Sequence, residues 1–258
     1  MNVKNSIIQL YFIKERIFMI PPDDKEIIFK YIEGEMNGTD FLDWILATRW
    51  LPADLYKPEY EKDLMKTKYP HIHDTEFCIK LFNLDSTLHN EYSKYMIKNI
   101  KPLEISQSMV KLLEYYFNII NLKTFSNYFD SNIDEFFSET GNDLSLEIFD
   151  SINKLSNVYL KNLIKEKFQD LLNNENTKRY FYTKLFKIYL AEIIKGSDED
   201  IIKYCRNLAV LHYETYIVPI IYSGYDSELD TPENIKYYKK DIITLSKEFL
   251  SYIEKIGL

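Results

Sequence analysis

The most apolar long segment of the chain, residues 197–225, carries a single histidine, His212, near its centre. Ser197 and Asp200 have the spacing of a capping box, which predicts that a helix begins there. Apolar residues then recur at helical spacing as far as His212. Pro219 must kink or end this helix, because proline has no amide hydrogen and clashes with the preceding turn. We therefore expect His212 to lie on or beside a buried helix face.

Three roles for His212 are open. In the first it is structural: a core imidazole should be mostly neutral and should donate a hydrogen bond to a carbonyl, hydroxyl or carboxylate of the neighbouring helix, because buried polar groups usually have partners. In the second it ligates haem iron, and in the third it shares a non-haem metal with Glu214. The structural role is the one that the sequence favours.

A longer pattern surrounds this histidine. It spans residues 180–225 and consists of Tyr189, Leu190, Gly196, Asp198, Leu208, His212, Ile217, Pro219, Tyr222 and Tyr225. The pattern resembles the proximal-histidine region of bacterial globin-coupled oxygen sensors and their haem-free stressosome relatives. The resemblance implies a haem with His212 as its axial ligand and Gln169 or Tyr159 in place of the family's distal tyrosine. Residues 223–234 interrupt the chain where that family has a long helix, so this sensor, haem-binding or haem-free, is the alternative hypothesis.

A second stretch combines carboxylates with aromatic residues: residues 128–143, YFDSNIDEFFSETGND. Asp130 and Asp134 lie four residues apart, as do Glu135 and Glu139, so two acidic ridges are expected on one helix. A solvated helix face would explain this pattern, and so would a docking face on which carboxylates steer a basic protein and aromatic side chains anchor it. The expected partner-binding residues are Asp130, Asp134, Glu135, Phe136, Glu139 and Asp143, extended by Asp226, Glu228 and Asp230 if these lie nearby.

Residues 31–52 read YIEGEMNGTDFLDWILATRWLP. This stretch resembles the N-terminal part of some bacterial toxin-immunity proteins, which begin with a short helix, a glycine-containing turn and a Phe-x-x-Trp helix. The resemblance implies an inhibitor whose partner is a cognate toxin. Together with the acidic tract and 22 tyrosines, it leads to our first hypothesis. The protein would be a non-enzymatic immunity protein that neutralises a basic toxin domain, such as a nuclease, through an acidic, tyrosine-rich surface.

The motifs of several enzyme and metal-binding classes are missing from the sequence. It has no glycine-rich phosphate loop, no Gly-x-Ser-x-Gly elbow and no Glu-x-x-His pair of the kind that helical di-metal enzymes use. His71 and His73, followed by Asp74, could hold zinc in a loop, but the chain has four histidines and no further zinc motif. We therefore predict no catalytic activity, no metal and, in the leading hypothesis, no cofactor.

Charge and cysteine usage restrict the partners and the compartment. A net charge of −8 argues against a nucleic-acid-binding protein, which needs a basic patch. No uncharged run approaches about 18 residues, so no membrane span is expected. The apolar N-terminal stretch is interrupted by Lys14, Glu15 and Arg16, which a signal-peptide core would not contain. Cys78 and Cys205 lie far apart in apolar helical contexts, as in proteins of the reducing cytoplasm.

The elements that must position these residues are helices. Six glycines and eight prolines in 258 residues favour long helices over turn-rich β architectures. The apolar periodicity predicts an all-α bundle of about ten to eleven helices, with two subdomains, 1–101 and 102–258, or a single domain. Helices are expected over 103–122 and 124–139, and 144–174 reads as one helix or as two broken near Asn157. A helix over 177–195 should pair antiparallel with the helix that carries His212.

Overall fold

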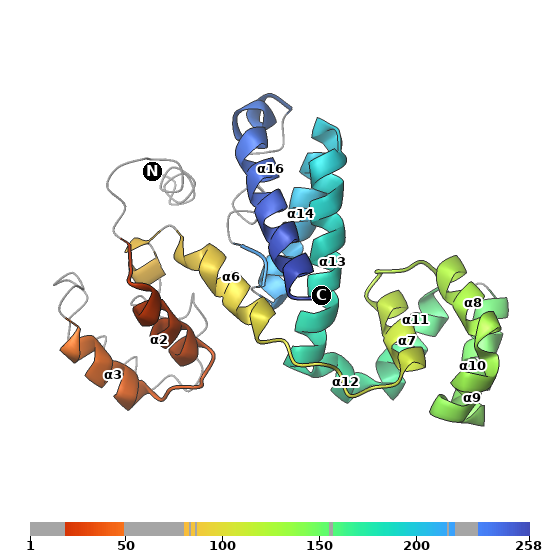
Figure 1. The fold of residues 1–258 in the computed structure, drawn as a ribbon. Coiled ribbons are helices and arrows are strands. Elements are labelled where there is room, and N and C mark those ends of the chain that lie inside the picture. The colour runs from red at the N-terminus through yellow and green to blue at the C-terminus, as the bar shows by residue number, and fades with distance from the viewer. Residues whose placement is uncertain are drawn as a thin grey trace. The chain divides into compact units, whose positions relative to one another are not determined.

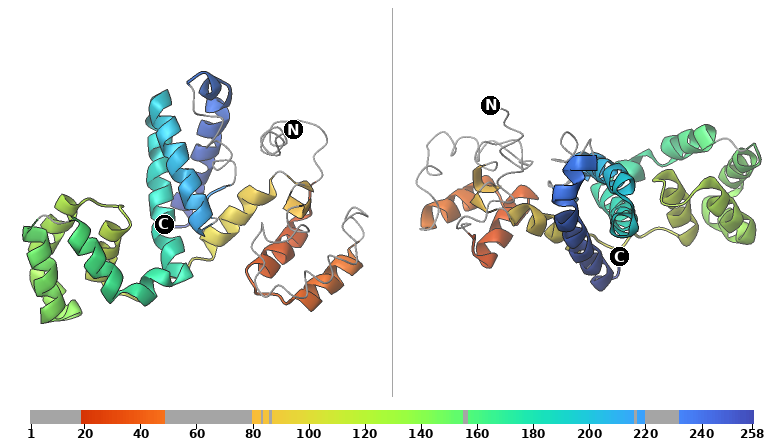
Figure 2. Two further views of the ribbon diagram at one scale, coloured as in Figure 1. Left: turned by 180° about the vertical axis from the view of Figure 1, so that it is seen from behind. Right: turned by 90° about the horizontal axis from the view of Figure 1, so that it is seen from above.

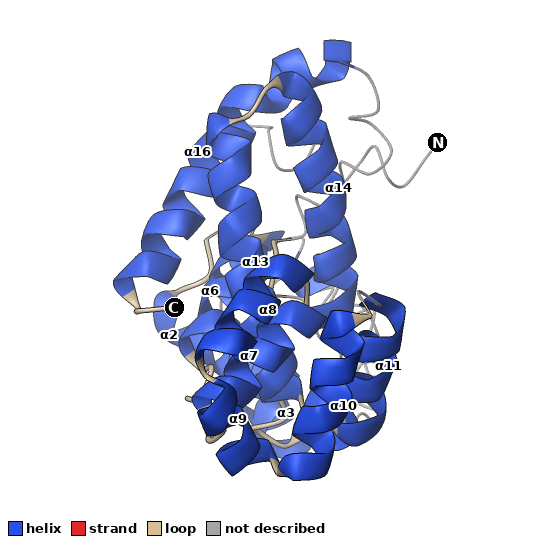
Figure 3. Cartoon of the chain, turned by 90° about the vertical axis from the view of Figure 1, so that its right-hand side faces the viewer, coloured by secondary structure: helices blue, strands red, loops and turns tan. Residues whose placement is uncertain are grey.

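The computed structural model describes residues 19–48, 80–82, 84–85, 87–154, 157–215, 217–219 and 232–258. Helices account for 80% of these residues, and none of them is in a strand (Figure 3). They form 13 helices, of which 11 have seven residues or more. The predicted all-α, multi-helix class is confirmed. Within the part that the structure describes, no helix is long and apolar enough to cross a membrane.

The chain separates into two compact units. The first unit comprises Met1–Tyr95 with Pro219–Gly224, and the second comprises Met96–Val218 with Tyr225–Leu258. The division falls within α6 (Leu88–Lys98). The division into helical subdomains over 1–101 and 102–258 stays a prediction.

The first unit contains α2 (Pro22–Ile32) and α3 (Gly38–Ala47), which contact each other. Gly34, with φ of 73°, follows α2 in a backbone conformation that glycine adopts readily. Asn37 caps α3, because its side-chain oxygen accepts a hydrogen bond from the Asp40 amide at 2.9 Å. Phe41 stacks on Trp44, with ring centroids 5.2 Å apart, and is itself completely buried. The Phe-x-x-Trp pattern of α3 thus contributes to the core of this unit.

The second unit begins with a series of short helices and ends with long ones (Figure 1). The bounds are α7 (Gln107–Tyr116), α8 (Leu122–Ser131), α9 (Ile133–Thr140), α10 (Asn142–Asn153), α11 (Asn157–Lys167), α12 (Gln169–Asn173), α13 (Glu175–Lys195), α14 (Asp198–Thr215) and α16 (Pro232–Lys255).

Helix caps make the short helices shorter than the apolar pattern predicts. Asn118 has φ of 60° and ends α7, in the left-handed conformation that asparagine tolerates at this position. Asn121 then caps α8 by accepting a hydrogen bond from the Thr124 amide at 2.9 Å. The helix predicted over 124–139 is broken at Asn132 into α8 and α9. The periodic segment 144–174 contributes to three helices: α10 ends at Asn153, α11 begins at Asn157, and a second break at Phe168 separates α11 from α12.

The long helices α13, α14 and α16 contact one another, and α14 runs antiparallel to α13 as predicted (Figure 2). The predicted capping box is present: the Asp200 amide donates to Ser197 Oγ at 3.3 Å, and the Ser197 amide donates to Asp200 Oδ2 at 3.0 Å. Gly196 allows the tight turn between α13 and α14. A Cβ atom at this position would lie 2.6 Å from Asp200 Cβ and 2.8 Å from the Glu192 carbonyl oxygen.

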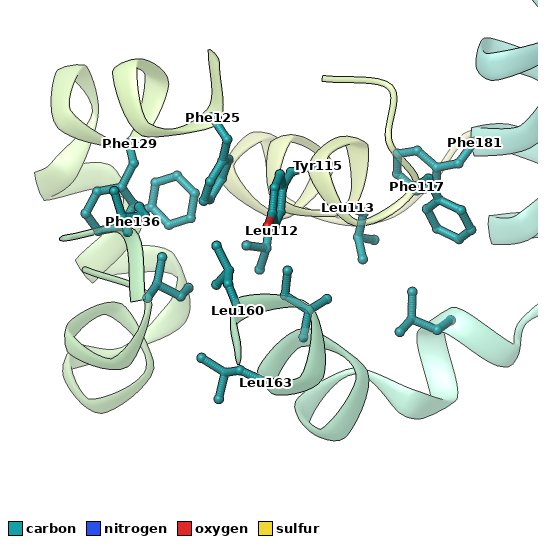
Figure 4. Close-up of a cluster of buried hydrophobic side chains, with 14 residues drawn as sticks. Leu112, Leu113, Tyr115, Phe117, Phe125, Phe129, Phe136, Leu160, Leu163 and Phe181 are labelled. Carbon is teal, nitrogen blue, oxygen red and sulfur yellow. The ribbon is translucent and has the colours of Figure 1, made fainter. Parts of the chain in front are cut away.

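An aromatic and aliphatic core holds the short helices of the second unit together (Figure 4). Phe129 and Phe136 face each other with ring centroids 4.8 Å apart, and Phe117 stacks on Phe181 at 5.0 Å. An ion pair reinforces the packing of α7 against α13. Glu114 is almost completely buried and lies 2.8 Å from Lys184 Nζ.

Candidate protein-docking surface

Helices α8, α9 and α10 carry an unusual run of charge. Between Thr124 and Asn153 the sequence contains seven acidic residues and no Lys, Arg or His. The seven are Asp130, Asp134, Glu135, Glu139, Asp143, Glu147 and Asp150. The whole chain has a net charge of −8, so these 30 residues hold almost all of its excess negative charge.

Most of these carboxylates lie on the surface. Asp130, Asp134, Glu135 and Asp143, all predicted to bind a partner, are exposed. Asp134, Glu135 and Asp143 lie in the first turns of α9 and α10, where the helix dipole favours negative charge. Asp130 lies in the last turn of α8, where the dipole disfavours a carboxylate, so helix stability does not explain its position.

The predicted acidic ridges are only partly correct. Glu135 and Glu139 share α9, as expected. Asp130 and Asp134 belong to different helices, because the chain leaves the helical conformation at Asn132. The prediction of a single acidic helix is therefore wrong, and the carboxylates lie on consecutive helices that contact one another.

Glu139 has a structural role that its place in the acidic tract does not predict. Its Oε2 accepts a hydrogen bond from the Ser108 amide, in the first turn of α7, at 3.3 Å. Hydrogen bonding by Ser108, and then by Ser106, lowers the pKa of the Glu139 carboxyl below its ordinary value. Glu139 therefore helps to hold the start of α7, and we exclude it from the docking residues.

Phe136 requires a correction. It was expected to anchor a partner, but its side chain is 0% exposed and packs between Phe129 and Phe125 (Figure 4). The break at Asn132 sets α9 on a new axis, and on that axis Phe136 points into the core. A side chain in this position cannot contact a partner unless the unit unfolds.

Two apolar side chains on α10 are exposed and, unlike Phe136, could contact a partner. Leu146 is 53% exposed and Phe149 is 39% exposed. Asp143, Leu146 and Asp150 are spaced by three and four residues, so an acid, an apolar residue and a second acid follow one another along one face of the helix. The Phe149 ring lies 6.4 Å from the ring of Phe129, the residue before Asp130. The sequence did contain a signal for these residues, because Leu146 and Phe149 are out of phase with Ile148 and Ile152, which are buried.

We name this set the α8–α10 surface. It consists of Asp130, Asp134, Glu135, Asp143, Leu146, Phe149 and Asp150. The other predicted partner-binding residues, Asp226, Glu228 and Asp230, lie outside the described residues.

His212 is a buried residue with a carbonyl partner. It is 3% exposed, and its Nδ1 lies 2.7 Å from the Val218 carbonyl oxygen. A carbonyl oxygen only accepts hydrogen bonds, so Nδ1 carries the proton. The predicted kind of partner is correct, but it comes from the segment that follows α14 and not from a neighbouring helix. The candidates for the distal haem position, Tyr159 and Gln169, are both exposed, on α11 and at the start of α12.

The described residues offer little for metal or thiol chemistry. They contain no group of three His, Cys, Asp or Glu side chains that could hold a metal ion. Burial raises the pKa of the Cys205 thiol to about 12, so this cysteine stays protonated and unreactive near neutral pH. His71, His73, Asp74 and Cys78 lie outside the described residues.

Comparisons with family models, with curated proteins and with solved structures find no match for this chain.

Proposed function

We propose that this protein is a non-enzymatic binding protein that holds a basic partner protein on the α8–α10 surface. One observation carries the proposal: a run of 30 residues without a basic side chain exposes carboxylates on α8, α9 and α10, and α10 also exposes two large apolar side chains. Such carboxylates attract a basic surface over distances of about 10 Å at moderate ionic strength. Leu146 and Phe149 can then supply apolar contact area once the partner has displaced water.

The arrangement also specifies the chemistry of the partner. A matching surface would present Lys or Arg side chains opposite Asp134, Glu135 and Asp143, around an apolar position that receives Leu146 and Phe149. The carboxylates would contribute mainly to the association rate and to selection against acidic proteins, and the apolar pair would contribute mainly to the lifetime of the complex.

The concrete form of this proposal is a bacterial, cytoplasmic immunity protein whose partner is a basic toxin domain. Its support is the resemblance of residues 31–52 to immunity proteins, together with the acidic α8–α10 surface. Co-expression with the product of the adjacent upstream gene tests it. We expect the two proteins to purify as a complex and the cells to survive a dose of the upstream product that is otherwise toxic. If the two proteins form no complex and the cells are not protected, the immunity proposal is wrong.

A further inference from the structure

The second unit contains a cleft that is separate from the α8–α10 surface. It has a volume of about 470 Å³ and is bounded by the end of α7 and by α11, α13 and α14. Clefts that bind small molecules commonly measure roughly 300–1,000 Å³. This cleft, which we name the α11–α14 cleft, has the size of a small-molecule site and is too small for a folded protein.

Two lysines of α11 line the cleft. Lys161 and Lys165 are four residues apart, so they project from the same face of the helix. Lys161 Nζ donates a hydrogen bond to Asn118 Oδ1 and lies 5.6 Å from the centre of the Tyr115 ring. Burial lowers the pKa of Lys161, because removal from water disfavours the charged ammonium.

Among the described residues Lys161 has no carboxylate partner, whereas two other shielded lysines, Lys25 and Lys184, each have one. Lys25 lies 3.1 Å from Asp85, and Lys184 lies 2.8 Å from Glu114. The only acid that lines the cleft is Glu214, and among the described residues no ion pair joins it to Lys161 or Lys165. A half-buried cation without a counter-charge is unfavourable, and a bound anion would stabilise it.

The rest of the cleft lining combines aromatic, amide and apolar side chains. It includes the tyrosines Tyr116, Tyr182 and Tyr189, the amides of Asn162 and Asn207, and the apolar Leu185, Val210 and Leu211. The rings are held by packing, because Tyr182 meets Phe117 edge to face at 5.2 Å and Tyr189 lies 5.5 Å from Tyr204. Aromatic faces that are fixed in advance can take a flat ring without a large loss of side-chain entropy.

We propose that the α11–α14 cleft binds a small organic anion that carries a planar ring. Lys161 and Lys165 hold the anionic group, the tyrosines pack against the ring, and the amides of Asn162 and Asn207 hydrogen-bond to its polar edge. The size of the cleft, the net positive charge of its lining and its tyrosine rings each point to this class of ligand. Nucleotides and aromatic carboxylates share this chemistry.

Calorimetric titration of the full chain tests the proposal and separates the two sources. The probes are AMP, which joins a phosphate to a ring, and indole-3-acetate, which joins a carboxylate to a ring. Adenosine supplies a ring alone, and inorganic phosphate an anion alone. We expect at least one of the ring-bearing anions to bind with Kd below about 1 mM. Adenosine and inorganic phosphate should bind at least about tenfold more weakly, because each lacks one half of the recognition.

The lysines provide the decisive variant. The double substitution Lys161→Met with Lys165→Met should weaken binding of the ring-bearing anion by about tenfold or more, because it removes both charge-assisted contacts. The matched control is Lys236→Met with Lys240→Met, an exposed lysine pair at the same spacing on α16, which should leave binding unchanged. If the double variant does not fold, Lys165→Met alone removes an exposed lysine and should still weaken binding.

Three results would overturn the proposal. The first is that neither ring-bearing anion binds below about 1 mM. The second is that adenosine or inorganic phosphate binds as tightly as AMP and indole-3-acetate do. The third is that the lysine variants bind the anion as tightly as the unsubstituted protein does.

Discussion

Asp85 shows how a single buried carboxylate can organise the first unit. It is completely buried and lies 3.1 Å from Lys25 Nζ. Its Oδ2 accepts a hydrogen bond from the Ile20 amide at 3.0 Å, and its Oδ1 accepts one from the Thr87 amide at 2.9 Å. The carboxylate thus joins the chain before α2, a lysine of α2 and the start of α6. A buried charge is tolerated when it is paired and hydrogen-bonded in this way.

The stability of the first unit should depend on the ionisation of Asp85. Burial acts to raise the pKa of this carboxyl, but hydrogen bonds from Thr87, Ile20 and Lys25 outweigh it, so the pKa lies below the ordinary value of 3.8. The stabilisation is fully present above about pH 4 and is lost as the pH falls through the lowered folded-state pKa. We expect Asp85→Asn to reduce the free energy of unfolding by about 3 kcal/mol at neutral pH, because it leaves Lys25 with a weaker set of partners.

Urea denaturation followed by circular dichroism at a series of pH values measures this effect. The difference between the wild-type protein and Asp85→Asn should shrink as the pH falls below about 4. Asp43→Asn is the matched control, because Asp43 is an exposed carboxylate on α3. A difference that stays constant down to acid pH would show that the charge of Asp85 is not what stabilises the unit.

The hydrogen bond between His212 and the Val218 carbonyl should stabilise the fold. His212→Leu removes the donor to the Val218 carbonyl and should lower the free energy of unfolding by about 1–3 kcal/mol. Binding to a protein partner should persist, because His212 is buried in the core and the α8–α10 surface belongs to other helices. Denaturant titration and a binding assay on the same preparation measure the two quantities.

The opposite result for His212 would favour the alternative hypothesis. A variant that folds normally but loses biological activity would make His212 a functional residue. Expression with added haem then distinguishes the roles, because a haem protein ligated by His212 gives a Soret band that His212→Ala removes. A protein that takes up no haem would leave only the haem-free sensor.

At the scale of helices, caps decide which side chains are available for binding. Asn132 ends α8 and precedes α9, and Gly141, with φ of 82°, lies between α9 and α10. Each break changes the axis of the next helix and therefore changes which side chains reach the core. Phe136 becomes a core residue in this way, and Leu146 and Phe149 are left at the surface.

Alanine substitution of two phenylalanines tests this assignment. Phe136→Ala should lower the free energy of unfolding by about 3–5 kcal/mol, because it leaves a cavity in the aromatic core. Phe149→Ala should cost about 1 kcal/mol or less in stability, since the ring is partly exposed. Once a partner has been identified, Phe149→Ala should weaken its binding by more than about 1 kcal/mol.

Thermal melting and calorimetric titration of the two variants give these values, and each variant serves as the control for the other. A large loss of stability in Phe149→Ala with no loss of affinity would exclude Phe149 as an anchor. A Phe136→Ala protein that remains as stable as the wild type would contradict the burial of that ring.

At the scale of the whole molecule, the distribution of charge matters more than its sum. The chain has a net charge of −8, and residues 124–153 alone contribute seven acids and no base. The excess negative charge is therefore concentrated in α8, α9 and α10. Concentrated charge of this kind raises the association rate, and the effect weakens as salt is added.

Charge reversal tests whether this field steers a partner. Asp134→Lys with Glu135→Lys should lower the association rate by about tenfold at low salt, because the attraction is partly replaced by repulsion. The dissociation rate should change less, since both residues are exposed. Stopped-flow or surface-plasmon measurements over a range of salt concentrations give both rates.

The matched control changes the net charge equally at another place. Asp241→Lys with Glu248→Lys alters two exposed acids of α16 and should leave the salt dependence of association almost unchanged. If both double variants slow association to the same degree, net charge is what matters, and the α8–α10 surface is not the docking site.

The helical class and several local features follow from the residue types and their spacing alone. The chain has few glycines and prolines to form turns, and its apolar residues recur at helical spacing, so it is expected to form helices. Each helix also pairs its own backbone amides and carbonyls within one segment. The capping box of Ser197 and Asp200, the burial of His212 and the exposure of Asp134 and Glu135 were also predictable. All of them follow from residue types a few positions apart.

The positions where the helices break, and the directions in which their faces point, depend on packing between distant parts of the chain. Asparagine either continues a helix or caps one, so the roles of Asn118, Asn121 and Asn132 depend on what packs around them. Phe136 and Phe149 have the same side chain in the same kind of amphipathic segment, yet one is a core residue and the other lies at the surface. The α11–α14 cleft was not predictable either, because its residues come from helices far apart in the sequence. Contacts at long sequence separation depend on how whole faces fit together, which local spacing does not encode.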